Sequence, residues 1–231
     1  YKKLFKKFQT KKLKISFAIQ NNPNGLPEAF TIGKDFIKKQ DVALILGDNI
    51  FYGEQLYKKI NEALKSLKTN KSTIFSYRVS DPEKYGVIEI KNNKIFRVVE
   101  KPKKFISNLA ITGLYFFKND VVKLSRNLKK SKRGEFEITD LIDYYLKEYR
   151  LNNITIDRGC AWLDAGNHDS YLQTSNFVET IEKRQGLKIS CLEEIALEKG
   201  FINKKELKIH LKAYPDNQYK QYLLRILNEK I

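Results

Sequence analysis

Methionine is absent from this sequence of 231 residues, and only two cysteines, one tryptophan and five prolines occur in it. Two cysteines, Cys160 and Cys191, are too few for a disulfide framework and lack metal-ligand spacing, so we expect a reducing, cytoplasmic setting. No apolar run approaches the roughly 18 residues that span a bilayer, so we expect no membrane partner. Because even an initiator methionine is missing, we expect the chain to be a fragment.

Acidic residues are scarce relative to basic ones, and the formal net charge is +17. Such an excess raises the question of a polyanionic partner. Only eight of the 44 basic residues are arginine, whereas proteins that read duplex DNA rely on Arg for bidentate contacts. We therefore assign most lysines to solvated faces and expect no nucleic-acid partner. A basic nucleic-acid-binding protein is kept as an alternative.

From Leu13 onward, short β-rich runs alternate with longer amphipathic runs, which is typical of helices that cover a sheet. We predict an α/β fold with a mixed, mostly parallel, Rossmann-like sheet, helices on both faces and a helical C-terminal tail. The pattern predicts strands at 14–19, 42–46, 72–79, 87–90, 94–99, 110–117, 153–157 and 160–163, and helices at 26–38, 55–68, 120–127, 140–149, 169–184, 192–199, 204–211 and 217–229.

Two of these segments carry further predictions. Residues 42–46 are all apolar, so we expect a strand that is buried on both faces. Asn92-Asn93 lies between two alternating runs, and Asn tolerates positive φ, so this pair predicts a hairpin turn.

Two aspartates each lie just beyond the carboxyl end of a predicted strand. Asp48 comes after the run 42–46, and Asp164 comes after the run 160–163. In open α/β sheets ligands bind outside the carboxyl ends of the strands, and two carboxylates there can share one Mg²⁺ that also contacts substrate phosphates. Each aspartate by itself could equally cap a turn or a helix, and only the fold could bring them together.

Three shorter motifs place polar groups at other strand ends. Glu100-Lys101 precedes a proline, where the glutamate suits sugar hydroxyls and the lysine suits a phosphate; an exposed ion pair is the alternative. Tyr85-Gly86 opens a strand, where a glycine permits close approach of a ligand. Gln20 follows a predicted strand, and Gly25 follows it in a turn that opens a helix.

In this order, the segments QNNPNGLPEAF, LGDNIFYG, DPEKYGV, TGLYF, RGEFEITD and WLDAG resemble the bacterial glucose-1-phosphate thymidylyltransferases, and the resemblance covers nearly the whole chain. LGDNIFYG and RGEFEITD favour this family over relatives that use UTP or CTP. The resemblance implies that dTTP and glucose 1-phosphate are the substrates and that dTDP-glucose, a precursor of dTDP-rhamnose and polysaccharide, and pyrophosphate are the products. It also implies a homo-oligomer, usually a tetramer.

The family pattern also implies residue roles. Asp48 and Asp164 would hold Mg²⁺ and Lys101 would bind the sugar phosphate, and these three are the implied catalytic residues. The other implied substrate-binding residues are Gln20 and Gly25 for the thymine, Asn49, Tyr85 and Gly86 for the sugar nucleotide, Glu100 for the glucose hydroxyls and Ile111 close to the sugar.

One departure from the family pattern matters most. The family opens with a Gly-rich loop that contains an Arg and is followed by a Pro-Lys pair, and this sequence has no such segment. We expect residues 1–186 to form a nucleotidyltransferase domain without its first strand and Gly-rich loop, with residues 187–231 as a helical segment packed on it. We expect the chain to be inactive alone. A nucleotidyltransferase for another base or sugar, and an inactive relative that still assembles, are the alternatives.

Overall fold

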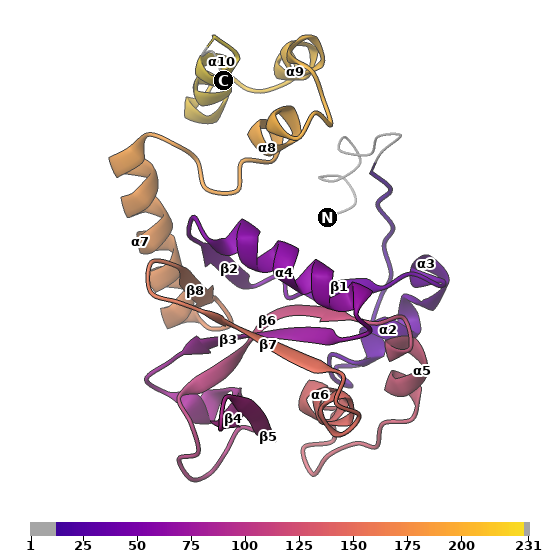
Figure 1. Ribbon diagram of the computed structural model, residues 1–231. Helices are drawn as coiled ribbons and strands as arrows, with labels where there is room; N and C mark the ends of the chain where they lie inside the picture. The colour runs from indigo at the N-terminus through magenta and orange to yellow at the C-terminus, as the bar shows by residue number, and fades with distance from the viewer. Residues whose placement is uncertain (1–12, 229–231) are drawn as a thin grey trace. The chain divides into compact units, whose positions relative to one another are not determined.

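The computed structural model describes residues 13–228. The described residues divide into two compact units, one formed by residues 16–174 and the other by residues 175–228 with residues 13–15. The first unit contains both sheets, and the second contains the last three helices (Figure 1). In the part that the structure describes, no helix combines the length and the hydropathy that a membrane span requires.

Six strands form the main sheet, in the order β5-β4-β6-β3-β7, with β1 also paired to β6. Strands β1, β3 and β4 each pair antiparallel with β6, and β3 pairs in parallel with β7. The sheet is therefore mixed, as predicted, but it is not mostly parallel: among its ladders in residues 13–228 only β3–β7 is parallel, because β6 at the centre runs against β1, β3 and β4, and β5 runs against β4. The strands are β1 Val42–Ile45, β3 Ser72–Arg78, β4 Gly86–Lys91, β5 Lys94–Glu100, β6 Leu109–Phe117 and β7 Leu151–Ile156.

Two further strands form a separate two-stranded sheet. β2 (Asn49–Tyr52) pairs antiparallel with β8 (Ala161–Asp164). The sequence predicted a strand close to β8 but no strand at β2, because four residues that directly follow a turn are too few for a periodic signal. This small sheet matters for function because it joins the two turns that carry the predicted metal ligands.

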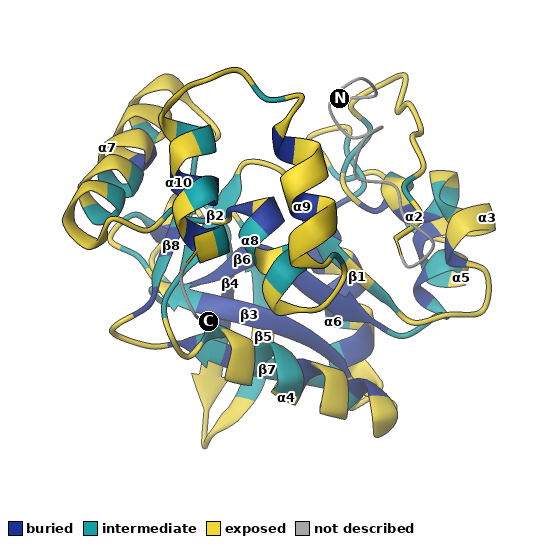
Figure 2. Ribbon diagram, turned by 90° about the horizontal axis from the view of Figure 1, so that it is seen from above, coloured by how far each residue is buried: buried dark blue, intermediate teal, exposed yellow. Residues whose placement is uncertain are grey.

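Helices cover both faces of the main sheet, as predicted. Every residue of β6 is buried (Figure 2), and its side chains alternate between two apolar clusters. Tyr115 and Phe117 pack with α2, α3 and α6 on one face, whereas Leu114 and Phe116 pack with α4 on the other. The helices of this unit are α2 Glu28–Ile32, α3 Lys34–Ile37, α4 Leu56–Lys68, α5 Val121–Arg126, α6 Ile138–Lys147 and the first turns of α7, which runs His168–Gln185.

The structure corrects three predictions for the N-terminal third of the chain. Residues 14–19 carry no regular secondary structure, because alternating side chains alone do not supply a ladder partner. The strand at 42–46 is shorter, Val42–Ile45, and only one of its faces is covered: Val42 and Leu44 pack against the core, whereas Ala43 and Ile45 on the other face are exposed. The helix at 26–38 is broken at Gly33 into α2 and α3.

The hairpin between β4 and β5 agrees with the prediction. Asn92 and Asn93 have φ values of +50° and +58°, as the two central residues of a type I′ turn require. The flanking residues Lys91 and Lys94 lie opposite each other in the ladder. A register shift between Glu89 and Ile90 then places Gly86 opposite Glu100.

The second unit contains α8 (Leu192–Glu198), α9 (Lys204–Leu211) and α10 (Gln218–Asn228). Asn203 and Glu206 form a capping box at the start of α9, which satisfies free backbone donors of the first turn. The helices surround a small apolar core that includes Leu207 and Leu223. The predicted packing of residues 187–231 on the α/β domain stays a prediction.

Candidate active site

The two predicted metal ligands lie together. Asn49 is opposite Asp164 in the β2–β8 ladder, and the backbone N–H of Ala165 donates to the carbonyl oxygen of Asp48 at 2.9 Å. A β-carbon at Gly166 would lie 3.1 Å from Oδ1 of Asp164 and 3.7 Å from Oδ2 of Asp48. The small sheet therefore brings two carboxylates that are far apart in the sequence around one point.

The carboxylates of Asp48 and Asp164 repel each other, and this repulsion affects the pKa of Asp164. Burial and the negative charge of Asp48 raise the pKa of Asp164 above its usual range. The backbone N–H of Gly166 and the charge of Lys101 oppose this shift but do not cancel it. Two like charges held this close favour a neutralising cation.

The donor set suits magnesium. Mg²⁺ takes hard oxygen ligands, and proteins usually hold it through one or two carboxylates while phosphates and water fill the other positions. Asp48 and Asp164 provide such a pair of carboxylates. Among residues 13–228 no group of three or more His, Cys, Asp or Glu side chains gathers as a complete metal cage.

Gly86, Glu100 and Ile111 form a second group. A β-carbon at Gly86 would lie 3.2 Å from Oε2 of Glu100 and 3.6 Å from Cδ1 of Ile111. It would also lie 2.7 Å from Cγ2 of Thr139, a distance that β-carbons do not tolerate. Only glycine fits at residue 86, and its missing side chain leaves backbone accessible next to a carboxylate.

The Glu100 carboxylate is held by side chains that we did not single out from the sequence. Thr139 donates its hydroxyl to Oε2 of Glu100 at 3.1 Å, and Nη1 of Arg133 lies 3.2 Å from Oε1. Arg133 also pairs with Glu135 and Glu137. Burial raises the pKa of Glu100, and the hydrogen bond from Thr139 is the largest opposing influence.

Lys101 and Tyr85 link the two groups. The backbone N–H of Lys101 donates to the carbonyl oxygen of Tyr85 at 3.0 Å, and Lys101 adopts a φ of +40°. Burial raises the pKa of both Asp164 and Glu100, and the positive charge of Lys101 opposes both rises. Tyr85 lies near Asp164, whose charge adds to burial in raising the pKa of the phenol. A lysine thus lies within electrostatic reach of both carboxylate groups.

Gln20 and Gly25 lie next to each other. Nε2 of Gln20 donates to the carbonyl oxygen of Gly25 at 3.1 Å and to Oε2 of Glu28 at 2.7 Å. Gly25 has a φ of +112°, and a β-carbon there would lie 2.1 Å from the carbonyl oxygen of Phe136. These contacts connect the Gln20 turn to the segment that carries Arg133, and thereby to Glu100.

Trp162 and Gly113 are two more residues that we did not single out from the sequence. Trp162 Nε1–H donates to Oδ1 of Asn49 at 2.7 Å, and the backbone N–H of Gly113 donates to the same oxygen at 2.9 Å. Trp162 lies in the motif WLDAG, and Gly113 lies in the motif TGLYF. The one available signal was that a buried indole N–H needs an acceptor.

A cavity of about 680 Å³ opens beside Asp164. Tyr85, Trp162 and Asp164 line one side of it. The end of β3 and the first turns of α7 form the other walls. Of the two aspartates, Asp164 therefore lines a space that could admit a ligand.

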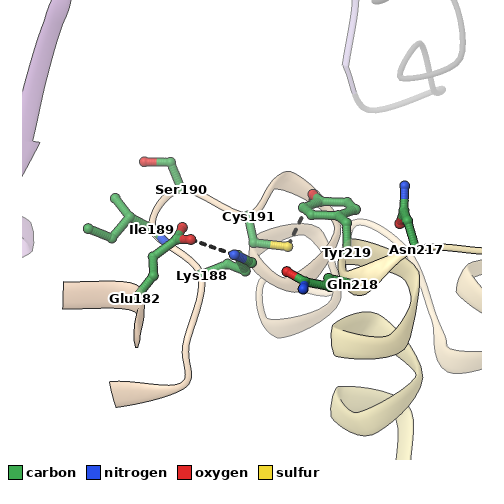
Figure 3. A pocket seen from close by; sticks show the side chains of 8 residues that line it. All are labelled: Glu182, Lys188, Ile189, Ser190, Cys191, Asn217, Gln218 and Tyr219. Atoms are coloured by element: carbon green, nitrogen blue, oxygen red, sulfur yellow. Dashed lines mark hydrogen bonds and ion pairs between the residues drawn. The ribbon is translucent and has the colours of Figure 1, made fainter. Parts of the chain in front are cut away.

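A second cavity, of about 570 Å³, lies in the unit that contains α8 to α10 (Figure 3). Its charged groups are paired with each other: Nζ of Lys188 lies 2.5 Å from Oε2 of Glu182. Sγ of Cys191 lies 3.3 Å from the Tyr219 hydroxyl, and burial raises the pKa of this thiol. A protonated, buried thiol is a structural group rather than a nucleophile.

Comparison with known proteins agrees with this geometry. The family model described as nucleotidyl transferase matches residues 1–181. The chain belongs to the nucleotidyl transferase family. Within that family it is 43% identical to the glucose-1-phosphate thymidylyltransferase of Neisseria meningitidis over 94% of this chain and 75% of that protein. It is 44% identical to the enzyme of the same name from Mycolicibacterium smegmatis, over 94% of this chain and 74% of that protein.

Solved structures show the same fold. A protein from Bacillus anthracis described as a glucose-1-phosphate thymidylyltransferase, in complex with a sucrose, matches with a TM-score of 0.63 and 33% identity, over 70% of this chain and 64% of that chain. A UDP-glucose pyrophosphorylase complexed with UDP-glucose matches with a TM-score of 0.64 and 25% identity, over 71% of this chain and 66% of that chain.

Proposed function

We propose that this site belongs to an enzyme that transfers a thymidylyl group from dTTP to glucose 1-phosphate, giving dTDP-glucose and pyrophosphate. The observation that carries the proposal is the meeting of Asp48 and Asp164 around Gly166, in a chain whose relatives bear this enzyme's name. In such a reaction a phosphate oxygen of the sugar attacks the α-phosphorus, and catalysis consists mainly of positioning and charge neutralisation.

Asp48 and Asp164 would hold the cation, and their crowded charges favour binding it. When bound, Mg²⁺ would neutralise and orient phosphate oxygens. Lys101 would bind the sugar phosphate as a point charge. Its charge acts on both Asp164 and Glu100, which suits a group that contacts the phosphate between the cation and the sugar.

Glu100 would bind the glucose hydroxyls. Thr139 and Arg133 contact different oxygens of this carboxylate, so its orientation is set before the substrate arrives. Gly86 would let the sugar approach the backbone, and Ile111 would pack against it. Tyr85 would form the neighbouring wall, and its ring lies 5.2 Å from that of Trp162 between centroids.

Gln20 and Gly25 would recognise the thymine. Asn49 would contact the sugar nucleotide through the second hydrogen of its amide, because the first is donated to Asp48. The side-chain amide of Gln20 lies against the Gly25 carbonyl and Glu28, so it would have to exchange one of these acceptors for the base.

A binding experiment tests the proposal without requiring turnover. Thermal unfolding of the purified chain with Mg²⁺ should shift upward with dTDP-glucose more than with UDP-glucose or CDP-glucose. A ligand at 100 times its Kd adds about 2.7 kcal/mol of stability. The shift should disappear in Asp164→Asn. An equal or larger shift with another nucleotide sugar would assign the chain to a related nucleotidyltransferase, and no shift with any of the three would reject the assignment.

We also infer a cytoplasmic homo-oligomer, most simply a tetramer, that supplies dTDP-glucose for dTDP-rhamnose and polysaccharide synthesis. The support for this inference is the motif resemblance and the names of the relatives. Light scattering of the chromatographed protein tests the oligomeric state. A monomer at micromolar concentration would contradict it.

A further inference from the structure

The side-chain amide of Asn49 is hydrogen-bonded at both ends. Its Oδ1 accepts the backbone N–H of Gly113 at 2.9 Å and the indole N–H of Trp162 at 2.7 Å. Its Nδ2 donates to Oδ1 of Asp48 at 2.8 Å. One amide thus connects β6 and β8 to a carboxylate of the candidate metal site.

The N–H groups of Gly113 and Trp162 determine the orientation of the Asn49 side-chain amide. A backbone N–H and an indole N–H can only donate, so the oxygen of Asn49 must face Gly113 and Trp162. Its NH₂ group must then face the carboxylate of Asp48, which can only accept. The reversed amide would place an oxygen against the carboxylate and leave the buried N–H of Trp162 without an acceptor, which costs about 1–3 kcal/mol.

Trp162 is held rigidly enough to act in this way. It is only 8% exposed. Its ring packs edge-to-face against Tyr85 and Tyr77, with centroid distances of 5.2 Å and 6.0 Å. It also lies opposite Phe51 in the β2–β8 ladder. The strand and both tyrosine rings therefore fix the direction in which the indole N–H points.

The Asn49 amide contacts only one of the two carboxylate oxygens of Asp48. Oδ1 of Asp48 accepts from Asn49, while Oδ2 lies 3.7 Å from the β-carbon position at Gly166. Oδ1 of Asp164 lies 3.1 Å from the same position. The orientation of the Asn49 amide therefore sets which oxygen of Asp48 faces Asp164.

We propose that Trp162 is a positioning residue that acts through Asn49: its indole N–H fixes the amide, and the amide holds Asp48 with Oδ2 facing Asp164, ready for a divalent cation. This inference rests on the proposed function, which assigns the cation to the two aspartates. Groups that orient metal ligands in this way typically change metal affinity by about 10- to 100-fold when they are removed.

The first measurement needs no metal. Trp162 is the only tryptophan, so the ¹H–¹⁵N spectrum contains one indole N–H resonance. In Asn49→Leu, which keeps the volume and removes the acceptor, this resonance should move upfield and exchange with water about fivefold faster. Tyr77→Phe is the matched control, because it keeps the ring beside Trp162 and should leave the exchange rate unchanged.

The second measurement is the Kd for Mn²⁺, used as the probe, by titration calorimetry of the whole chain. Trp162→Phe and Asn49→Leu should each weaken binding about tenfold. The double variant should be within about twofold of either single variant, because both remove the same connection. Tyr77→Phe should stay within about twofold of the unaltered chain. If Trp162→Phe weakened Mn²⁺ binding only by disturbing the structure in general, its loss of binding free energy would instead add to the loss in Asn49→Leu.

The outcomes separate this inference from the proposed function. Mn²⁺ binding that Asp164→Asn abolishes but that Trp162→Phe and Asn49→Leu leave unchanged would overturn the inference and keep the metal site. Multiplying losses in the double variant would overturn it as well. Absence of any Asp164-dependent Mn²⁺ binding would overturn the proposed metal site and with it the role of Trp162. Should Trp162→Phe fail to fold, Asn49→Leu still decides through the indole resonance and Mn²⁺ affinity.

Discussion

Gly113 donates its backbone N–H to Oδ1 of Asn49, and a β-carbon at residue 113 would lie 2.4 Å from that same oxygen. It would also lie 2.8 Å from Cγ of Leu46. The Asn49 side chain can therefore occupy its position only because residue 113, in the middle of the fully buried strand β6, is glycine. Strand propensity alone disfavours glycine at such a position, so the close approach is the physical reason for it.

Gly113→Ala should destabilise the protein by about 1–3 kcal/mol, because the new methyl group overlaps the Asn49 amide and its neighbours are packed. It should also displace the amide and weaken Mn²⁺ binding. Gly47→Ala is the control, since nothing lies within 4 Å of a β-carbon there. Urea unfolding of both variants measures the difference, and equal stabilities would contradict the assignment.

Asp164→Asn should raise the melting temperature of the metal-free protein at pH 7. The folded-state pKa of Asp164 is raised by burial and by Asp48, so its ionisation costs stability as pH rises from the unfolded pKa, about 3.9, through the folded value. The rise in melting temperature that Asp164→Asn causes should therefore become smaller as the pH is lowered toward 4. Calorimetry in EDTA measures it, with the exposed Asp35→Asn as control.

With Mg²⁺ present, the unaltered chain should melt at a higher temperature than Asp164→Asn. The unaltered chain should gain about 2.7 kcal/mol at 100 times its Kd, whereas Asp164→Asn should gain little. If Mg²⁺ stabilises both proteins equally, the cation binds elsewhere and the two aspartates have another role.

Arg133→Met should weaken binding of glucose 1-phosphate by about tenfold, because the partly buried Glu100 carboxylate loses a charged partner worth about 1.5 kcal/mol. Arg133 contacts Glu100 and Glu137, so its loss should also raise the pKa of Glu100 further. The neighbouring exposed Lys132→Met removes the same charge without these contacts. Calorimetric titration with the sugar phosphate compares them, and equal affinities would exclude Arg133 from the sugar end of the site.

Ile45→Lys should reduce aggregation without lowering stability by more than about 0.5 kcal/mol. Ile45 is 59% exposed on the strand whose second edge carries no strand in the described part of the chain, and a lysine on an edge strand opposes intermolecular pairing. Leu44→Lys is the matched control. That side chain packs against the core, so its replacement should cost about 2 kcal/mol. Light scattering on heating, together with urea unfolding, distinguishes the two.

Glu193→Ala should destabilise the unit formed by α8 to α10 by about 2 kcal/mol, because two tyrosine hydroxyls lose their shared acceptor. Glu193 is 5% exposed and accepts from Tyr214 and from Tyr219. Glu193→Gln keeps an acceptor and should lose less. Amide hydrogen exchange in α8, α9 and α10 is the measurement, and unchanged protection in the Ala variant would contradict the role of this buried carboxylate.

Local pattern was sufficient where a segment's structure depends on its own residues. The Asn92-Asn93 turn was predicted because two adjacent asparagines tolerate positive φ, and both adopt it. The helix that became α4 was predicted from apolar residues three or four apart, and these face the sheet. The break at Gly33 was missed because the apolar pattern continues across it, although the helix does not.

The candidate site was predicted in part. Asp48, Asp164, Gly86 and Glu100 were selected from strand-end positions and from the family resemblance, and the structure brings them together in two adjacent groups. Arg133, Thr139, Gly113 and Trp162 were missed as individual residues, since each contributes through a partner in another element. A hydrogen bond between residues 113 positions apart, such as that from Trp162 to Asn49, leaves no mark on local periodicity.

The sequence by itself determined the α/β class, most helices, the hairpin turn and the motifs that carry chemistry, because backbone hydrogen bonding and side-chain periodicity act over a few neighbouring residues. Only the tertiary structure decided that Asp48 and Asp164 share one point, that β1 pairs on one edge, and that Trp162 holds Asn49. Those outcomes depend on which strands become neighbours, and that choice is made by burial and ladder formation between distant segments.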